Sequence, residues 1–165
     1  MSVVVASICN ATVEAIGGQV PAMVLSAPLV EEAMKAGGIL YAVRRRDLDG
    51  PMDGIVYAGW TAVGFAAVEN VEYFARAHME GQLATVFVLR GLLGPFAHPL
   101  FTAWTGLAIG GAVASGRPVF PRMLWGYVLA VLSHALWNGS ALAPQLLGDA
   151  GVQLLGATVL AFGLL

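Results

Sequence analysis

Long apolar segments separated by short polar breaks are the feature of this sequence that most restricts its fold. Hydrophobic residues make up 58% and charged residues 11% of the 165 residues, whereas soluble domains carry about 25% charged residues. Apolar segments repeated along a chain are typical of membrane-spanning helices. We therefore predict an all-α protein, a polytopic transmembrane helix bundle in the lipid bilayer, with residues 1–165 as a single domain.

About five segments are expected to span the membrane. They cover residues 20–43 (with a start as early as Thr12), 53–77, 82–115, 122–142 and 151–165. Asp53 is expected to cap the second segment, and the third is expected to kink at Gly94-Pro95 and again at Pro99. Residues 1–9 are interpreted as the tail of an earlier helix, and the last segment is too short to cross fully, which is compatible with a shortened chain.

Arginines lie in alternate loops. Arg44, Arg45 and Arg46 follow the first segment, and Arg117 lies in the loop before the fourth. The positive-inside rule predicts that both loops face the cytoplasm.

The net charge of −2 excludes nucleic acid as a partner, since nucleic-acid binding needs a basic face. One cysteine, Cys9, excludes a disulfide framework and a cysteine-based zinc site.

Several ionisable residues fall inside the predicted spans, where each costs about 2.5–3.5 kcal/mol on insertion scales. They are Glu31, Glu32, Lys35, Glu69, Glu72, Arg90, His98 and His134. At a helical rise of 1.5 Å per residue, Glu31 lies about 20 Å from Arg44, and Glu69 about 24 Å from Asp53. On the same rise His98 lies about 25 Å from Ser115, and His134 about 18 Å from Arg122. Four segments therefore place polar side chains at a common depth.

Spacing and residue type indicate hydrolytic chemistry at that depth. Glu31 can pair with Lys35 on one helix face, and His134 and Asn138 have the same spacing and can face one cavity. Satisfied ion pairs would explain one such pair, but the whole group favours a polar functional site inside the bundle. Carboxylates can activate water, and histidines can bind a metal or stabilise charge. The sequence has no serine–histidine–acid set, HExxH motif or phosphate loop.

Four blocks of residues resemble the PrsW family of intramembrane proteases. They are Glu31-Glu32-x-x-Lys35 within residues 27–35, Asp53 to Tyr57 with Glu69-Asn70 and Tyr73, Arg90 with His98, and His134-x-x-x-Asn138. The blocks occur in the family's order and cover residues 27–138.

The resemblance implies a polytopic intramembrane peptidase related to the CAAX-prenyl endopeptidase and Abi superfamily. It implies membrane-anchored protein substrates, such as anti-sigma factors, and a bacterial cell membrane. It also implies residue roles: Glu31 and Glu32 would be the catalytic carboxylates, His98 and His134 essential histidines, and Lys35, Glu69, Asn70, Arg90 and Asn138 would support them.

The resemblance leaves two versions of the chemistry open. In one, Glu31 deprotonates water, His134 and Asn138 stabilise the oxyanion, and His98 helps to hold the water. In the other, His98, His134 and Glu31 bind zinc and leave an open position for water. The histidines lack the compact spacing of familiar zinc motifs, which slightly favours the version without a metal cofactor.

Other functions are compatible with the same residues. A proton- or ion-coupled transporter could use them as a relay, although transporters often contain internal repeats and none is visible here. A CAAX-type prenyl-protein endopeptidase and a catalytically inactive membrane scaffold are further alternatives. The sequence also allows an oligomer.

Overall fold

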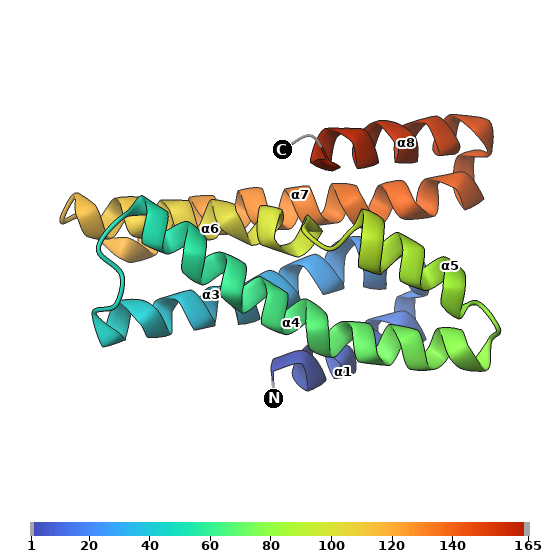
Figure 1. Cartoon of the computed structure of the whole chain (residues 1–165), viewed down its shortest axis with the longest axis horizontal. Coiled ribbons are helices and arrows are strands. Elements are labelled where there is room, and N and C mark those ends of the chain that lie inside the picture. Colours follow the sequence, from blue (N-terminus) through green and yellow to red (C-terminus); the bar gives the residue numbers. More distant parts are fainter. Residues whose placement is uncertain (1, 164–165) are drawn as a thin grey trace.

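The computed structural model describes residues 2–163, and within that range it contains helices and no strands (Figure 1). This confirms the all-α prediction. The elements are α1 (Ser2–Gly17), α2 (Gln19–Pro21), the π-helix η1 (Ala22–Ser26), α3 (Ala27–Arg45), α4 (Pro51–Met79), α5 (Leu83–Phe87), the π-helix η2 (Val88–Leu93), α6 (Ala97–Ala114), α7 (Val119–Leu147) and α8 (Asp149–Gly163).

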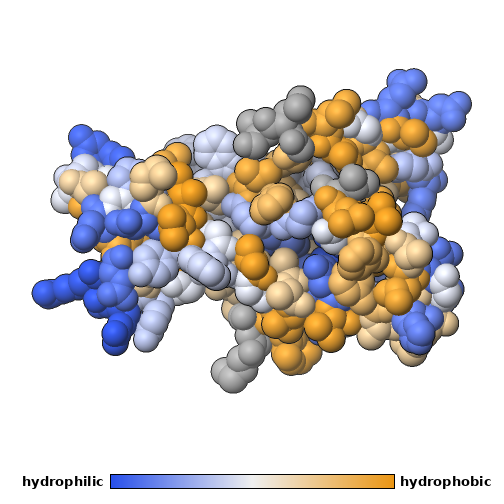
Figure 2. Space-filling view, viewed as in Figure 1, coloured by the Kyte–Doolittle hydropathy of each residue, from blue (hydrophilic) through white to orange (hydrophobic). Residues whose placement is uncertain are grey.

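Four helices, α3, α4, α6 and α7, run along the long axis of the molecule, and α8 folds back beside α7 (Figure 1). The α3–α4 and α6–α7 connections lie at one end, and the α4–α5 and α7–α8 connections lie at the other. Figure 2 shows hydrophilic side chains gathered at both ends of this axis and hydrophobic side chains between them. Chain reversals and polar residues therefore share the two ends of the bundle.

Two stretches are long and apolar enough to cross a membrane, Leu83–Ala114 and Val119–Leu147. The first contains the break between η2 and α6, and the second is α7. There are also two shorter apolar helices: Asp149–Phe162 packs against α7, and Val3–Gly17 packs against α3 and η1. Helices α3 and α4 together carry about half of the charged and histidine residues, and charged residues lower the hydropathy of any window that contains them.

The first predicted segment is longer than expected and is preceded by a separate helix. Gln19 to Arg45 form one continuous helical stretch that includes η1. Thr12, the earliest predicted start, lies instead in α1, which ends at Gly17. The chain turns at Gly18, whose φ of 85° is a conformation that glycine adopts without strain.

Two local expectations were wrong. Gly50, not Asp53, occupies the N-cap of α4, because Pro51 takes the first helical position, where its missing N–H is not needed. The Asp53 carboxylate instead accepts a hydrogen bond from the Asp49 backbone N–H at 2.9 Å. The helix breaks at Gly94-Pro95 as predicted, but Pro99 causes no second break, because it lies in the first turn of α6.

Glycines at a Gly106-x-x-x-Gly110 spacing bring the helix backbones into contact. A Cβ added to Gly106 would overlap the Gly54 carbonyl oxygen of α4, and one added to Gly54 would overlap the Gly106 carbonyl oxygen. Gly110 lies equally close to the backbone of Gly50 and Pro51. The α4–α6 pair therefore depends on the absence of side chains at these positions.

Gly54→Ala is expected to destabilise the bundle, because the new methyl group meets α6 backbone that cannot rotate away. Overpacking costs about 1–3 kcal/mol, and a backbone clash belongs to the upper part of that range. Gly64→Ala on the same helix is the matched control, since its Cβ meets nothing within 4 Å. Thermal unfolding in detergent, followed by circular dichroism, should show a lower Tm for Gly54→Ala alone.

Candidate functional site

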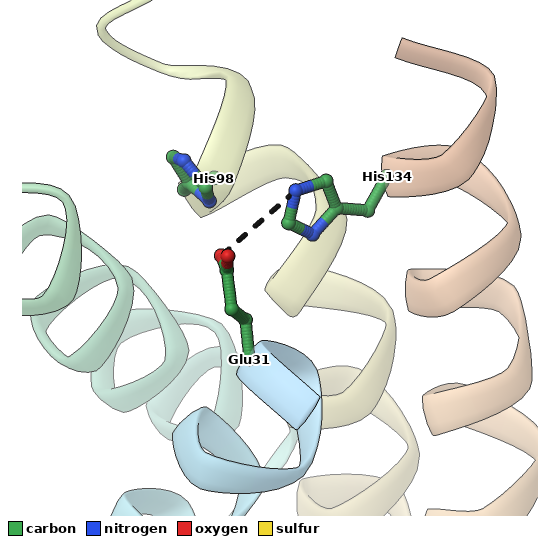
Figure 3. Close-up of side chains that lie close together, drawn as sticks. All are labelled: Glu31, His98 and His134. Atoms are coloured by element: carbon green, nitrogen blue, oxygen red, sulfur yellow. Dashed lines mark ion pairs between the residues drawn. The ribbon is translucent and has the colours of Figure 1, made fainter. Parts of the chain in front are cut away.

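Glu31, His98 and His134 converge from three helices, α3, α6 and α7 (Figure 3). Each offers one possible ligand atom, and these atoms lie within 4.8 Å of one another. Glu31 Oε2 lies 3.9 Å from His134 Nε2 and 3.6 Å from Lys35 Nζ. Glu31 is 3% exposed, and its Oε2 has no hydrogen-bond partner among the described residues.

The neighbouring Glu32 is fully engaged in hydrogen bonds. Its Oε1 accepts from Lys35 Nζ at 2.8 Å and lies 3.1 Å from His134 Nδ1, and its Oε2 accepts from Thr102 Oγ1 at 2.8 Å. Glu32, Lys35 and Thr102 are all 0% exposed. The two adjacent glutamates therefore differ: Glu32 ties three helices together, whereas Glu31 presents a free oxygen atom.

The contact with Glu32 sets the tautomer of His134. A carboxylate accepts hydrogen bonds, so the proton of a neutral His134 belongs on Nδ1. Nε2 then carries a lone pair and faces Glu31 Oε2. In this state Nε2 accepts hydrogen bonds, which differs from the oxyanion-stabilising role that we expected of His134.

Lys35 lies among the acidic and imidazole groups. Its Nζ is 2.8 Å from Glu32 Oε1 and 2.8 Å from His98 Nδ1, and it lies 4.7 Å from the centre of the Phe65 ring. An ammonium group can only donate, so His98 Nδ1 accepts from it and Nε2 carries the proton. His98 Nε2 lies 3.2 Å from Glu69 Oε2, so the Nε2–H group donates a hydrogen bond to that carboxylate.

Arg90 anchors the outer side of this network from η2. Its guanidinium pairs with the Glu69 carboxylate, donates from Nε to Asn70 Oδ1 at 2.8 Å, and stacks 3.8 Å from the centre of the Tyr73 ring. The Glu69 carboxylate thus bridges Arg90 and His98. Of the supporting residues expected from the sequence, Glu69 and Asn70 both contact Arg90 here.

Asn138 and His134 line the same cavity, but the Asn138 amide is hydrogen-bonded elsewhere. Its Nδ2 donates to the Met23 carbonyl oxygen in η1 at 2.9 Å. The Asn138 amide therefore holds η1 to α7, and it is Glu32 that orients His134.

A cavity of about 170 Å³ lies beside Glu31, His98, His134 and Asn138. Its far wall contains three polar residues of α1, Ser7, Asn10 and Glu14, which sequence reasoning missed. Ser7 donates to Glu72 at 3.0 Å, and Ser26 donates to Asn10 at 2.8 Å. The spacing of these three residues along α1 places them on one helix face, so the signal was present in the sequence.

Thr102 and Phe101 were also missed. Thr102 lies four residues after His98, so both project from one face of α6. Phe101 stacks on the His134 ring with centroids 4.9 Å apart and an interplanar angle of 21°. The His134 ring is therefore fixed by an aromatic neighbour on its face and by Glu32 at its edge.

The donor set has the composition of a catalytic zinc site, two imidazoles and one carboxylate. Glu31 Oε2 lacks a hydrogen-bond partner, and His134 Nε2 is backed by a carboxylate at Nδ1, as is usual for ligating histidines. His98 has both nitrogens engaged, so it would exchange one contact, with Lys35 or with Glu69, for a metal bond. With that exchange at His98, the three residues fit a divalent metal.

Comparison with known proteins points to one family. The model of the PrsW family intramembrane metalloprotease matches residues 1–164. Protease PrsW of Geobacillus kaustophilus is 30% identical over 122 residues, which cover 73% of this chain and 52% of that protein. Protease PrsW of Oceanobacillus iheyensis is 27% identical over 111 residues, 67% of this chain and 49% of that protein.

The chain thus spans about half the length of these curated relatives. No solved structure matches it. The family model covers the helices that carry Glu31, His98 and His134. Together, this match and the curated relatives show that the chain belongs to the PrsW family of intramembrane proteases.

Proposed function

We propose that the chain hydrolyses peptide bonds of membrane-anchored proteins, with Glu31 as the base that takes a proton from the attacking water. The observation that supports this most is the pair of lone-pair groups, Glu31 Oε2 and His134 Nε2, 3.9 Å apart at the cavity wall. Two such acceptors complement either the two hydrogens of one water molecule or a metal ion. A water held through both hydrogens has its own lone pairs free to attack a carbonyl carbon.

The other residues have separate roles in this proposal. Glu32 and Phe101 hold His134 so that Nε2 faces the cavity. Lys35 and Glu69 hold His98, and Arg90 holds Glu69. Asn138 has a second amide N–H besides the one donated to Met23, and that group can donate to the oxyanion that forms on the scissile carbonyl.

Glu31, His98 and His134 would hold a zinc ion, which would act as a Lewis acid on the carbonyl and lower the pKa of bound water. The remaining assignments do not depend on it. Glu32 still orients His134, and the cavity still admits water beside Glu31.

We further propose about five membrane spans: Gln19 to Arg45, α4, the broken α5–α6 stretch, α7 and α8. The connections that carry Arg46 and Arg117 lie at the same end of the molecule (Figure 1), which supports a cytoplasmic position for that end. Substrates of the anti-sigma type, with one membrane span, would then present their chain to a site buried between the helices.

The proposal is tested by reconstituting the chain in liposomes with single-span reporter proteins and identifying the cleaved bonds by mass spectrometry. His134→Ala is expected to lower kcat/KM by about 10²-fold or more, as expected for a positioned acid–base group. His78→Ala is the control, since His78 is exposed on α4 and lies outside the cavity. Folded wild-type protein that leaves every reporter intact would contradict the proposal.

Metal content measured on the same samples, with cleavage assayed before and after chelation, separates the two versions of the chemistry. One zinc per chain, with cleavage lost on chelation and restored by zinc, would establish the metal version. Cleavage that persists in metal-free protein would establish the version that uses Glu31 without a metal.

A further inference from the structure

A second, larger cavity of about 680 Å³ lies between α4, α6 and α8. Ile55 and Gly59 line it from α4, Leu100 from α6, and Leu160 and Phe162 from α8. No ionisable side chain lines it in the described part of the chain. We call this cavity the apolar groove; its volume is within the range of ligand-binding pockets, about 300–1,000 Å³.

The apolar groove meets the candidate active site at Trp137. The Trp137 side chain lines the apolar groove, the polar cavity beside Glu31, and a small cavity of about 40 Å³ between them. Ala97 lines the groove and the small cavity, and the next residue, His98, lines the small cavity and the polar one. One indole ring and one turn of backbone therefore separate the groove from the catalytic groups.

Aromatic neighbours hold Trp137 in this position. The Trp137 ring centroid lies 6.3 Å from that of Phe101 and 5.7 Å from that of Phe162. Phe101 in turn stacks on His134. The wall between the groove and the site is thus fixed relative to the His134 imidazole.

The break before α6 lies at the same junction. Pro95 lines the groove and the small cavity, and a Cβ on Gly94 would lie 3.4 Å from Trp137 Cζ2. Non-helical backbone at membrane depth is found where it lines a cavity or is buried in protein. A peptide bond can be attacked only where its own helix has unwound, and an extended segment points successive side chains in opposite directions.

We propose that the apolar groove binds an apolar side chain of the substrate's membrane segment next to the bond that is cleaved, and that Trp137 sets the size of side chain accepted. This inference rests on the proposed hydrolysis. Its support is the continuity of the groove with the site through Trp137 and Ala97. A lipid chain would gain nothing from that continuity, whereas a substrate segment must reach both places at once.

The test compares reporters that differ only in one residue beside the cleaved bond, alanine or phenylalanine. Gly59→Trp fills the groove, because a Cβ at Gly59 meets nothing within 4 Å and the residue lines the cavity. It is expected to lower the phenylalanine-to-alanine ratio of kcat/KM by about tenfold or more, since each methylene in an apolar pocket changes kcat/KM by about 10–200-fold. Trp137→Ala is expected to raise the same ratio.

Gly64→Trp is the matched control on α4, because its Cβ also meets open space and the residue lines none of the three cavities. The ratio in this variant should equal that of wild type. An unchanged ratio in Gly59→Trp, with cleavage intact, would overturn the inference and leave the proposed function standing.

A binding readout separates the two proposals. A photoreactive residue at position 59 is expected to crosslink the reporter's membrane segment in the Glu31→Gln variant. Crosslinking without any cleavage by wild type would support the groove and contradict the hydrolysis. Crosslinking to lipid alone, or to no reporter, would overturn the groove as a substrate site.

Discussion

Glu31→Gln is expected to lower kcat by about 10²–10⁴-fold, the usual contribution of a general base, while the Tm stays close to that of wild type. Glutamine has nearly the same shape as glutamate but cannot accept a proton from water. The Oε2 atom of Glu31 has no hydrogen-bond partner among the described residues, and Lys35 Nζ is closer to Glu32 (2.8 Å) than to Glu31 (3.6 Å), so Lys35 keeps its nearer carboxylate in the variant. Cleavage of a reporter in liposomes and thermal unfolding in detergent provide the two measurements.

Glu32→Gln is the control on the next residue of the same helix. Glu32 accepts hydrogen bonds from Lys35 and Thr102 and contacts His134 Nδ1, so its loss disturbs three helices. Removing one partner of a buried charge pair costs about 3–5 kcal/mol, so we expect a lower Tm together with lower activity. Equal effects of the two variants on Tm would contradict a structural role of Glu32 that Glu31 lacks. Full activity of Glu31→Gln would contradict the assignment of Glu31 as the base.

This difference between Glu31 and Glu32 could not be predicted from the sequence. Both are ionisable residues in one apolar segment, and their distance from the loop arginines is nearly the same. Helical geometry turns adjacent residues about 100° apart, so one faces the cavity and the other faces Thr102 and His134. Which of them has the free oxygen depends on the side chains of α6 and α7, and these are distant in sequence.

Features set by local chemistry were easier to predict. The predicted break at Gly94-Pro95 follows from the backbone properties of glycine and proline. The error at Pro99 came from treating a proline in the first helical turn as an interior one. The π-helices η1 and η2 had no sequence signal that we recognised, yet they carry the Met23 carbonyl bound by Asn138 and the side chain of Arg90.

The role of α1 was missed for a different reason. Residues 1–9 were interpreted as the tail of another helix because they are apolar, although Ser7, Asn10 and Glu14 share a face in the complete helix. Their importance becomes visible only when that face is placed against Glu72 and Ser26. Membrane helices can hide a polar face of this kind, because the average hydropathy of the segment stays high.

Lys35→Met is expected to destabilise the protein by about 3–5 kcal/mol, the usual cost of breaking a buried charge pair from one side. Lys35 is 0% exposed, and its Nζ contacts Glu32, His98 and Glu31 at 2.8, 2.8 and 3.6 Å. Methionine fills a similar volume but leaves the two glutamates without their cation. The measurement is Tm in detergent, with the exposed pair of Arg45 and Asp47 as the comparison.

Arg45→Met on the same helix should change stability by less than about 1 kcal/mol, because exposed ion pairs contribute little. The double variant Lys35→Met with Glu32→Gln should recover part of the lost stability, since it removes a buried negative charge together with the positive one. A double variant less stable than the sum of the two single changes would show that Lys35 acts through shape rather than charge. Recovery of Tm without recovery of cleavage would show that Lys35 also positions His98, whose Nδ1 it contacts.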